Sequence, residues 1–222
     1  MTAIIFDMDG VIFDSERLWL DCCIETAPEF GMENIVETCH RCIGVTPGVT
    51  RDILLETYRD AALVTAFQEK AVSLFREFYS AGRLGMKPGV KELLCFLKSR
   101  ACKTAIASST RTDIVESELS DAGIRGFFDA IVGGDQVRRS KPNPDIFLMA
   151  AEKLGEKPEN CTVIEDSFNG IRAAKAAGMT AIMVPDQLEP NDEMRRLADR
   201  IFPSLRNVQE LLTKKLPQTT LP

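Results

Sequence analysis

The amino-acid sequence predicts an α/β fold: a parallel sheet with helices on both faces, and a small all-helical unit inserted after the first strand. From residue 87 onward, short apolar runs alternate with helical patterns, as is typical of parallel sheets. Residues 15–84 instead show helical spacing and no convincing strand. Several of the predicted strands end directly in polar residues or glycines, as strands do at the ligand-binding edge of an open α/β sheet.

The first predicted strand, Ile4–Phe6, leads straight into two acids, Asp7 and Asp9, and the run ends at Gly10. Side chains alternate along a strand, so two acids two positions apart lie close together at its carboxyl end. Burying such a pair is costly unless a cation or a proton relieves the repulsion. A strand end with two solvated acids is the alternative, and we favour a buried pair.

Residues 15–84 are predicted to form a helical domain, and residues 1–14 and 85–222 an α/β core. Either Asp14 or Ser15 could cap the first helix of the insert, because both side chains can accept hydrogen bonds from a helix N-terminus. A unit of this size is near the small end of what forms its own hydrophobic core. The rest of the core is predicted to contain helices near 90–99, 112–122, 145–154 and 169–177, strands at 103–107, 130–132, 161–164 and 180–184, and a disordered tail from residue 214.

Four predicted strands end in groups suited to metal or phosphate chemistry, and the carboxyl ends of parallel strands meet at one edge of a sheet. Carboxylates suit a hard divalent cation such as Mg²⁺, whereas a lysine, a hydroxyl and backbone N–H groups suit phosphate. The combination predicts phosphoryl transfer. The groups are Asp7 and Asp9, Ser108 and Ser109, Gly133 and Gly134, and Glu165 and Asp166, with Lys141 shortly after the third strand.

Four motifs therefore follow one another in order: Asp7-Met8-Asp9-Gly10-Val11, Ser108 after a strand, Ser140-Lys141-Pro142, and Ile164-Glu165-Asp166-Ser167. This ordered set resembles the haloacid dehalogenase-like superfamily of phosphohydrolases. The subgroup that it resembles most contains β-phosphoglucomutase and the small sugar phosphatases. The resemblance implies a Rossmann-like core, and it identifies the helical insert as the family's cap domain.

The resemblance also implies the roles of the acids. Asp7 would be the nucleophile and form an aspartyl-phosphate. Asp9 would protonate the leaving oxygen and later take a proton from water. The metal, Mg²⁺, would bind the Asp7 carboxylate, the Asp9 backbone carbonyl and the Asp166 carboxylate, with Glu165 acting directly or through water.

Substrate contacts follow from the same resemblance. Ser108, together with backbone N–H groups that include Ser109, would hold phosphate oxygens, and Lys141 would offset charge on the phosphoryl group. Glu16 and Trp19 are expected to face the leaving group, as is the loop from Gly44 to Arg51. For Trp19 the alternative is packing within the helical core, which is the usual role of an aromatic residue at helical spacing. Cap closure would exclude water.

Within the family, the second acid, Asp9, argues against dehalogenases. Lys70, mid-helix in the insert, is interpreted as a solvated charge and not as the Schiff-base lysine of phosphonate-cleaving relatives. β-Phosphoglucomutases carry a histidine where this chain has Trp19 and an arginine where it has Pro47. We therefore expect a Mg²⁺-dependent phosphatase of small phosphomonoesters, either sugar or sugar-alcohol phosphates. The alternatives are a sugar-phosphate mutase and a non-enzymatic scaffold.

Composition limits the partners and the compartment. The net charge is -6 without a basic run, which argues against nucleic acid. No apolar run is long enough to span a membrane, and we see no secretory signal. Seven cysteines, mostly in apolar stretches, suit a reducing cytoplasm, and Cys39-His40-Arg41-Cys42 is interpreted as packing and not as a zinc site. The expected partner is a small phosphorylated metabolite, and the default oligomeric state is a monomer.

Overall fold

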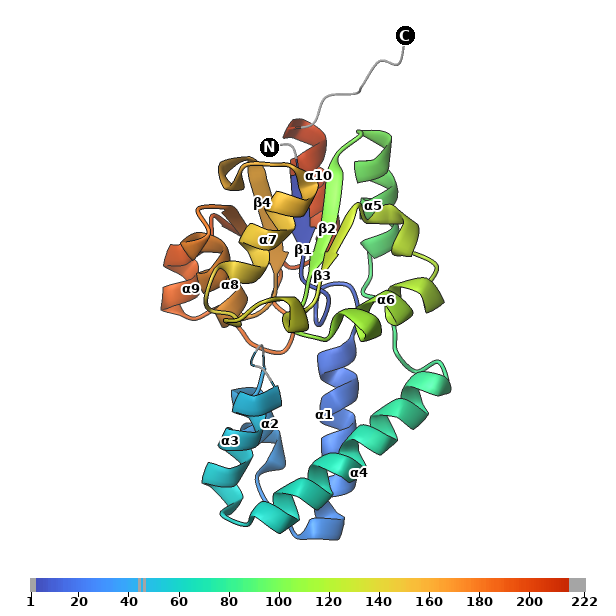
Figure 1. Cartoon of the computed structure of the whole chain (residues 1–222), viewed down its shortest axis with the longest axis vertical. Coiled ribbons are helices and arrows are strands. Elements are labelled where there is room, and N and C mark those ends of the chain that lie inside the picture. The colour runs from blue at the N-terminus through green and yellow to red at the C-terminus, as the bar shows by residue number, and fades with distance from the viewer. Residues whose placement is uncertain (1–2, 44, 46, 216–222) are drawn as a thin grey trace.

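The structure, a computed structural model, describes residues 3–43, 45 and 47–215. It has a sheet with its flanking helices in one part and a group of four helices in the other, which lies below the sheet in Figure 1. The first part contains both ends of the described chain. The second part is entered after the first strand and left before α5.

Six parallel strands form the sheet in the order β3-β2-β1-β4-β5-β6. The central strand β1 pairs with β2 on one side and β4 on the other, so that Ile5 lies between Ala105 and Val163. The chain passes from β1 to β2 and β3, and then crosses to the other side of β1. This change of direction opens a crevice at the carboxyl ends of β1 and β4. The strands are β1 (Ala3–Phe6), β2 (Lys103–Ala107), β3 (Ala130–Val132), β4 (Cys161–Glu165), β5 (Thr180–Met183) and β6 (Arg200–Ile201).

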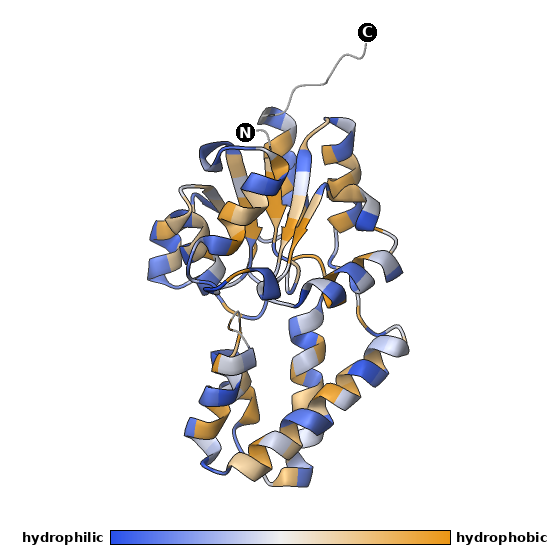
Figure 2. Ribbon diagram, in the orientation of Figure 1, coloured by the Kyte–Doolittle hydropathy of each residue, from blue (hydrophilic) through white to orange (hydrophobic). Residues whose placement is uncertain are grey.

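Alternating side chains of β1 bury both faces of the sheet. Ile4 and Phe6 join the hydrophobic cluster that includes α5, α6 and α10, whereas Ala3 and Ile5 join the cluster that includes α7, α8 and α9. Figure 2 shows the resulting apolar strands between helices with polar outer surfaces. The predicted α/β class with helices on both faces is confirmed. The helices are α5 (Val90–Ser99), α6 (Thr112–Asp121), α7 (Asp145–Leu154), α8 (Phe168–Ala176), α9 (Asp192–Leu197) and α10 (Leu205–Lys215).

The inserted unit has a hydrophobic cluster of its own. Phe67 of α4 is fully buried there and contacts Phe30 edge to face, with ring centroids 6.0 Å apart. The helical insertion after the first strand is thus confirmed, whereas the exact domain limits at residues 15 and 84 remain a prediction. The helices are α1 (Ser15–Thr26), α2 (Ile35–Arg41), α3 (Pro47–Tyr58) and α4 (Ala61–Ser80).

Polar contacts lie near both segments that connect the insert to the core. The hydroxyl of Tyr79, at the end of α4, donates a hydrogen bond to Asp121 of α6 at 2.5 Å. On the other side, the ammonium of Lys87 lies 2.5 Å from Asp186 and 3.4 Å from Asp14, which directly precedes α1. The Tyr79 contact joins the insert to the core, whereas the Lys87 contacts hold the two connecting segments in place on the core.

Some predicted elements need correction. Strand β6 was not predicted, because a strand of two residues cannot show alternation. Helices α9 and α10 were not predicted either. Helix α10 continues through Lys214, where a disordered tail was expected to begin, and residues 216–222 lie outside the described part. Asp14 occupies the N-cap position of α1, but its side chain makes no capping hydrogen bond. Short 3-10 turns occur at Ala27–Phe30, Arg125–Phe127, Gly134–Gln136 and Pro158–Asn160.

Candidate active site

A cleft of about 620 Å³ lies between the carboxyl edge of the sheet and the inserted helices. Residues from both parts line it, so a molecule bound there would contact the core and the cap together. The lining residues include Asp7, Asp9, Lys141, Glu165, Asp166, Ser167, Ser109, Thr110, Ile114 and Glu118 from the core, and Ser15, Glu16, Trp19, Pro47 and Phe75 from the insert.

Three buried carboxylates meet at the floor of the cleft. Asp7 follows β1, Glu165 ends β4, and Asp166 comes next in the chain, and these residues offer oxygen atoms that all lie within 4.8 Å of one another. Pairing of β1 with β4 brings them together, since the backbone N–H of Asp7 donates to the carbonyl of Ile164 at 3.0 Å. The predicted convergence at the strand ends is therefore present in the structure.

A buried lysine connects two of these acids. The Nζ atom of Lys141 lies 2.5 Å from Oδ1 of Asp7 and 2.7 Å from Oε1 of Glu165. Burial alone would lower the pKa of Lys141, but the two carboxylates raise it above its ordinary value. The lysine is therefore positively charged, and it orients the Asp7 carboxylate from one side.

One ammonium does not balance three carboxylates. Burial raises the pKa of Asp7 to about 8 against the opposing pull of Lys141. Burial and the neighbouring Glu165 also raise the pKa of Asp166 well above its ordinary value. A further cation would relieve this repulsion, and three oxygen donors at this separation suit a hard divalent ion. The residues present therefore fit a metal site.

Gly10 leaves the space that Asp166 occupies. Its φ of +76° lies in the left-handed region that favours glycine, and a Cβ atom at this position would lie 2.4 Å from Oδ2 of Asp166. The glycine of the first motif therefore permits the turn and also the close approach of the acid from the fourth motif.

Asp9 belongs to a different hydrogen-bond network. Its Oδ1 accepts a hydrogen bond from the hydroxyl of Ser15 at 2.7 Å. Its Oδ2 accepts from the hydroxyls of Ser108 at 3.1 Å and Thr110 at 2.9 Å. Three donors from two segments, the start of α1 and the loop after β2, hold the side chain. A hydroxyl can donate or accept, so these contacts can persist when Asp9 carries a proton.

The remaining predicted substrate residues divide into two groups. Ser109, Glu16 and Trp19 line the cleft, and Trp19 also contacts Phe75 edge to face at 6.1 Å and packs on the cap cluster. Both interpretations of Trp19 therefore agree with its position. Ser108 is fully buried, and its hydroxyl donates to Asp9, so its contact with phosphate remains a prediction.

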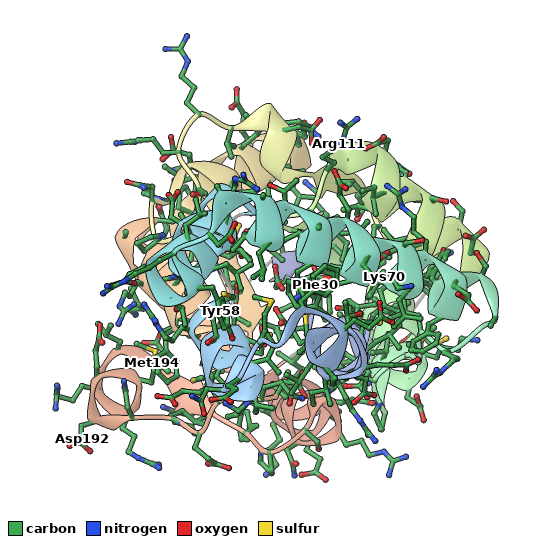
Figure 3. All side chains as sticks on the ribbon, turned by 90° about the horizontal axis from the view of Figure 1, so that it is seen from below. Phe30, Tyr58, Lys70, Arg111, Asp192 and Met194 are labelled. Atoms are coloured by element: carbon green, nitrogen blue, oxygen red, sulfur yellow. The ribbon has the colours of Figure 1, made fainter. Side chains whose placement is uncertain are left out.

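The loop from Gly44 to Arg51, expected to face the leaving group, contributes Val45, Pro47 and Thr50 to the lining of the cleft. Arg51 donates hydrogen bonds to Gln68 at 3.2 Å and Thr65 at 3.0 Å within the cap, and Gly44 is outside the described residues. Lys70, labelled on α4 in Figure 3, is half-exposed and lies 3.8 Å from Glu29. Cys39 is buried in the hydrophobic cluster of the cap and also lines the cleft.

Several site residues were not predicted from the sequence. Ser15 and Thr110 hold Asp9, and Ser167 donates from its backbone N–H and its hydroxyl to Oε2 of Glu165, at 2.7 and 2.9 Å. Ser167 is the last residue of the fourth motif and Thr110 lies two residues after Ser108, and these places in the sequence were the only signal for them. Glu118, on α6, also lines the cleft, and no motif contains it.

Residues 4–184 match the family described as haloacid dehalogenase-like hydrolase. The chain belongs to this family. It is 35% identical to a phosphorylated carbohydrates phosphatase of Thermotoga maritima over 82% of this chain and 84% of the relative. It is 30% identical to hexitol phosphatase B of Escherichia coli over 96% of each chain. The haloacid dehalogenase-like membership and the class of phosphoric monoester hydrolase expected from the sequence are confirmed.

Solved structures of family members share the fold. A β-phosphoglucomutase of Clostridium difficile is 26% identical, with a TM-score of 0.80 and coverage of 97% of each chain. CbbY of Rhodobacter sphaeroides, in complex with phosphate, is 28% identical, with a TM-score of 0.74 over 94% of this chain and 96% of that one. In the described part of this family member, no helix is both long and apolar enough to cross a bilayer.

Proposed function

We propose that this protein is a Mg²⁺-dependent phosphatase that hydrolyses sugar or sugar-alcohol phosphates through an aspartyl-phosphate intermediate. The observation that carries this proposal is the buried group of Asp7, Lys141, Glu165 and Asp166 at the floor of a cleft that the cap also lines. Relatives named as phosphatases of phosphorylated carbohydrates and hexitols support the substrate class.

The metal would be held by the carboxylates of Asp7 and Asp166 and the backbone carbonyl of Asp9, with Glu165 acting directly or through water. When bound, Mg²⁺ would neutralise charge on the phosphoryl oxygens and on the acid cluster. Lys141 adds a positive charge next to Asp7, and Ser109 would offer its backbone N–H to the phosphate. Positioning and charge neutralisation supply most of the catalysis in phosphoryl transfer.

In the first step, an oxygen of the Asp7 carboxylate attacks phosphorus, and the bond between phosphorus and the leaving alcohol breaks. Asp9, held by Ser15 of the cap and Thr110 of the core, gives its proton to the leaving oxygen. The products are a free alcohol and an aspartyl-phosphate. The Lys141 ammonium remains beside Asp7 and offsets the charge that accumulates there.

In the second step, Asp9 accepts a proton from a water molecule as that water attacks phosphorus. The bond between phosphorus and the Asp7 oxygen breaks, which releases inorganic phosphate and restores the Asp7 carboxylate. Both steps use Asp9 at the same place, so one well-held acid can serve the departing alcohol and the entering water.

We propose hydrolysis and not the mutase reaction. In this chain, Trp19 and Pro47 line the cleft at the positions where the mutase pattern has a histidine and an arginine. A mutase must hold a second phosphate group in this region, and an indole and a proline ring offer it no positive charge. Seven free cysteines support a reducing compartment, the cytoplasm, and the proposed partner is a small phosphorylated metabolite, with a monomeric enzyme.

A panel of sugar, polyol and nucleotide monophosphates with Mg²⁺ tests the proposal. We expect free phosphate from hexose or hexitol phosphates. A transfer of phosphate between positions 1 and 6 without release would instead indicate a mutase. Asp7→Asn should abolish turnover without unfolding the core, and Asp192→Asn, at an exposed position on the periphery in Figure 3, should keep it. Activity that persists in Asp7→Asn would reject Asp7 as nucleophile.

A further inference from the structure

Glu118 is an acidic residue in the wall of the cleft that the proposed reaction does not use. It lines the cleft together with Ile114, one turn earlier on α6, and only 8% of the residue is exposed. Its chain neighbour Leu119 and Val115, three positions earlier, are both fully buried in the core. The carboxyl group therefore lies on the inner side of α6, at the border between the core and the cleft.

The described part of the structure offers this carboxyl no counter-charge. Its Oε2 atom is buried and has no hydrogen-bond partner there. The charged groups that act on it are Asp9 and Asp121, both acids. Burial raises the pKa of Glu118 to about 8, and Asp9 adds to this shift. The carboxyl is therefore mostly neutral at pH 7, where it can both donate and accept a hydrogen bond.

Asp7, Asp9 and Glu165 differ from Glu118 in this respect. Asp7 and Glu165 accept hydrogen bonds from Lys141, and Asp9 accepts three from hydroxyl groups. A buried polar group without a partner lacks the hydrogen bonds that it would make with water in the unfolded chain. Native proteins keep few such groups. An apolar side chain beside Leu119 would avoid the loss of these hydrogen bonds. The acid at this position is therefore best explained by a ligand that supplies the missing hydrogen bond.

We propose that Glu118 determines specificity by forming a hydrogen bond with a hydroxyl group of the leaving alcohol. This inference rests on the function proposed above. Asp9 would protonate the leaving oxygen. Among the charged groups, Asp9 has the largest effect on the Glu118 carboxyl. The cap residues Trp19 and Phe75, in contact with each other, line the same cleft. A sugar or polyol chain presents both C–H surface for these rings and hydroxyls for Glu118.

Two substitutions and two substrates test the role. Glu118→Leu removes the hydrogen-bonding group and keeps apolar bulk, whereas Glu118→Gln keeps a donor and an acceptor. Each variant is assayed with the best hydroxylated substrate of the panel and with n-hexyl phosphate, whose alkyl chain has no hydroxyl. We expect Glu118→Leu to lower kcat/KM for the hydroxylated substrate at least tenfold and to leave n-hexyl phosphate unchanged or improved. Glu118→Gln should remain within about threefold of the wild type for both.

The outcomes separate this inference from the function on which it rests. Equal losses for both substrates in Glu118→Leu would show a structural role and overturn the inference, as would no loss for either. A best substrate without hydroxyl groups would also overturn it. If the wild type hydrolyses no sugar or polyol phosphate, the proposed function itself fails. Hydrolysis of n-hexyl phosphate by Glu118→Leu shows that the variant is folded.

Discussion

The hydroxyl of Ser15, the first residue of α1 in the cap, donates a hydrogen bond to Oδ1 of Asp9 at 2.7 Å. The proposed general acid of the core is thus held in part by the inserted helices. Ser108 and Thr110 hold the other carboxylate oxygen from the core side. A movement of α1 relative to the sheet would therefore change one of the three contacts that orient Asp9.

Replacing Ser15 tests this connection. Ser15→Ala removes one donor to a carboxylate, a contact that contributes roughly 1.5 kcal/mol or more. We expect about tenfold lower kcat, with KM changed less than threefold, and partial recovery in Ser15→Thr. Steady-state kinetics on the best substrate measure this effect. Ser120→Ala, on the exposed side of α6, serves as control, and an unchanged kcat in Ser15→Ala would exclude a positioning role.

Gly170 of α8 provides a test of how tightly Glu165 is held. A Cβ atom at Gly170 would lie 1.7 Å from Oε1 of Glu165. Contacts with Lys141 and Ser167 leave this carboxylate no free direction in which to move. We expect Gly170→Ala to lower kcat/KM at least tenfold although alanine favours helices.

Gly48→Ala is the matched control for the Gly170 substitution. Gly48 also lies in a helix, α3, and an added Cβ atom would meet no atom within 4 Å. Its kcat/KM should therefore match the wild type. If Gly170→Ala also kept wild-type kinetics, the Glu165 carboxylate would be free to move, and its proposed place beside the metal would be wrong.

Much of this site was predictable from the sequence because strand ends and short motifs coincide. Strands β2 and β3 have the predicted bounds, and Asp7, Lys141 and Asp166 meet at one edge as parallel topology requires. The partners of Asp9 were not predictable, because a serine or threonine hydroxyl shows its acceptor only in the folded chain. Ser15, for example, fits the pattern of a helix cap, but its hydroxyl is directed to Asp9.

Glu118 was missed for a different reason. Buried Val115 and Leu119 mark the inner face of α6, and an acid beside them resembles the polar border of an amphipathic helix. Whether such a border faces solvent or a cleft depends on what packs opposite, which here is the separate cap. Periodicity within one helix carries no information about that distant segment.

Metal binding should stabilise the folded protein. Ligand at 100 times its Kd adds about 2.7 kcal/mol, which for a chain of this length raises Tm by roughly 5–10 °C. We expect this rise when Mg²⁺ is added after EDTA treatment, measured by differential scanning fluorimetry. Asp166→Asn should lose the rise, and its metal-free Tm should exceed that of the wild type, because one of the repelling acids is gone.

Asp192→Asn controls for the removal of an acid as such. Asp192 is exposed and lies on α9, so this variant should keep the full rise in Tm with Mg²⁺. An equal rise in Asp166→Asn would place the stabilising metal at another site. No rise in the wild type would contradict the assignment of the acid cluster as a metal site.

The buried carboxyl of Glu118 should make stability depend on pH. Its pKa is raised from 4.5 to about 8 by burial and by Asp9, so between these values the native state binds more protons than the unfolded state. The free energy of unfolding must then fall as pH rises through this window. Glu118→Gln lacks this dependence and should therefore gain stability relative to the wild type between pH 5 and pH 8.

Each unit of pKa difference corresponds to about 1.4 kcal/mol. The free energy of unfolding of Glu118→Gln relative to the wild type should therefore rise by at most about 5 kcal/mol across this pH range. Urea unfolding of both proteins in EDTA at pH 5 and pH 8 measures it. Glu152→Gln, at an exposed position on α7, should differ from the wild type by the same amount at both pH values. If Glu118→Gln behaves like this control, the Glu118 carboxyl titrates normally in the native state, because only a raised native pKa separates the two variants.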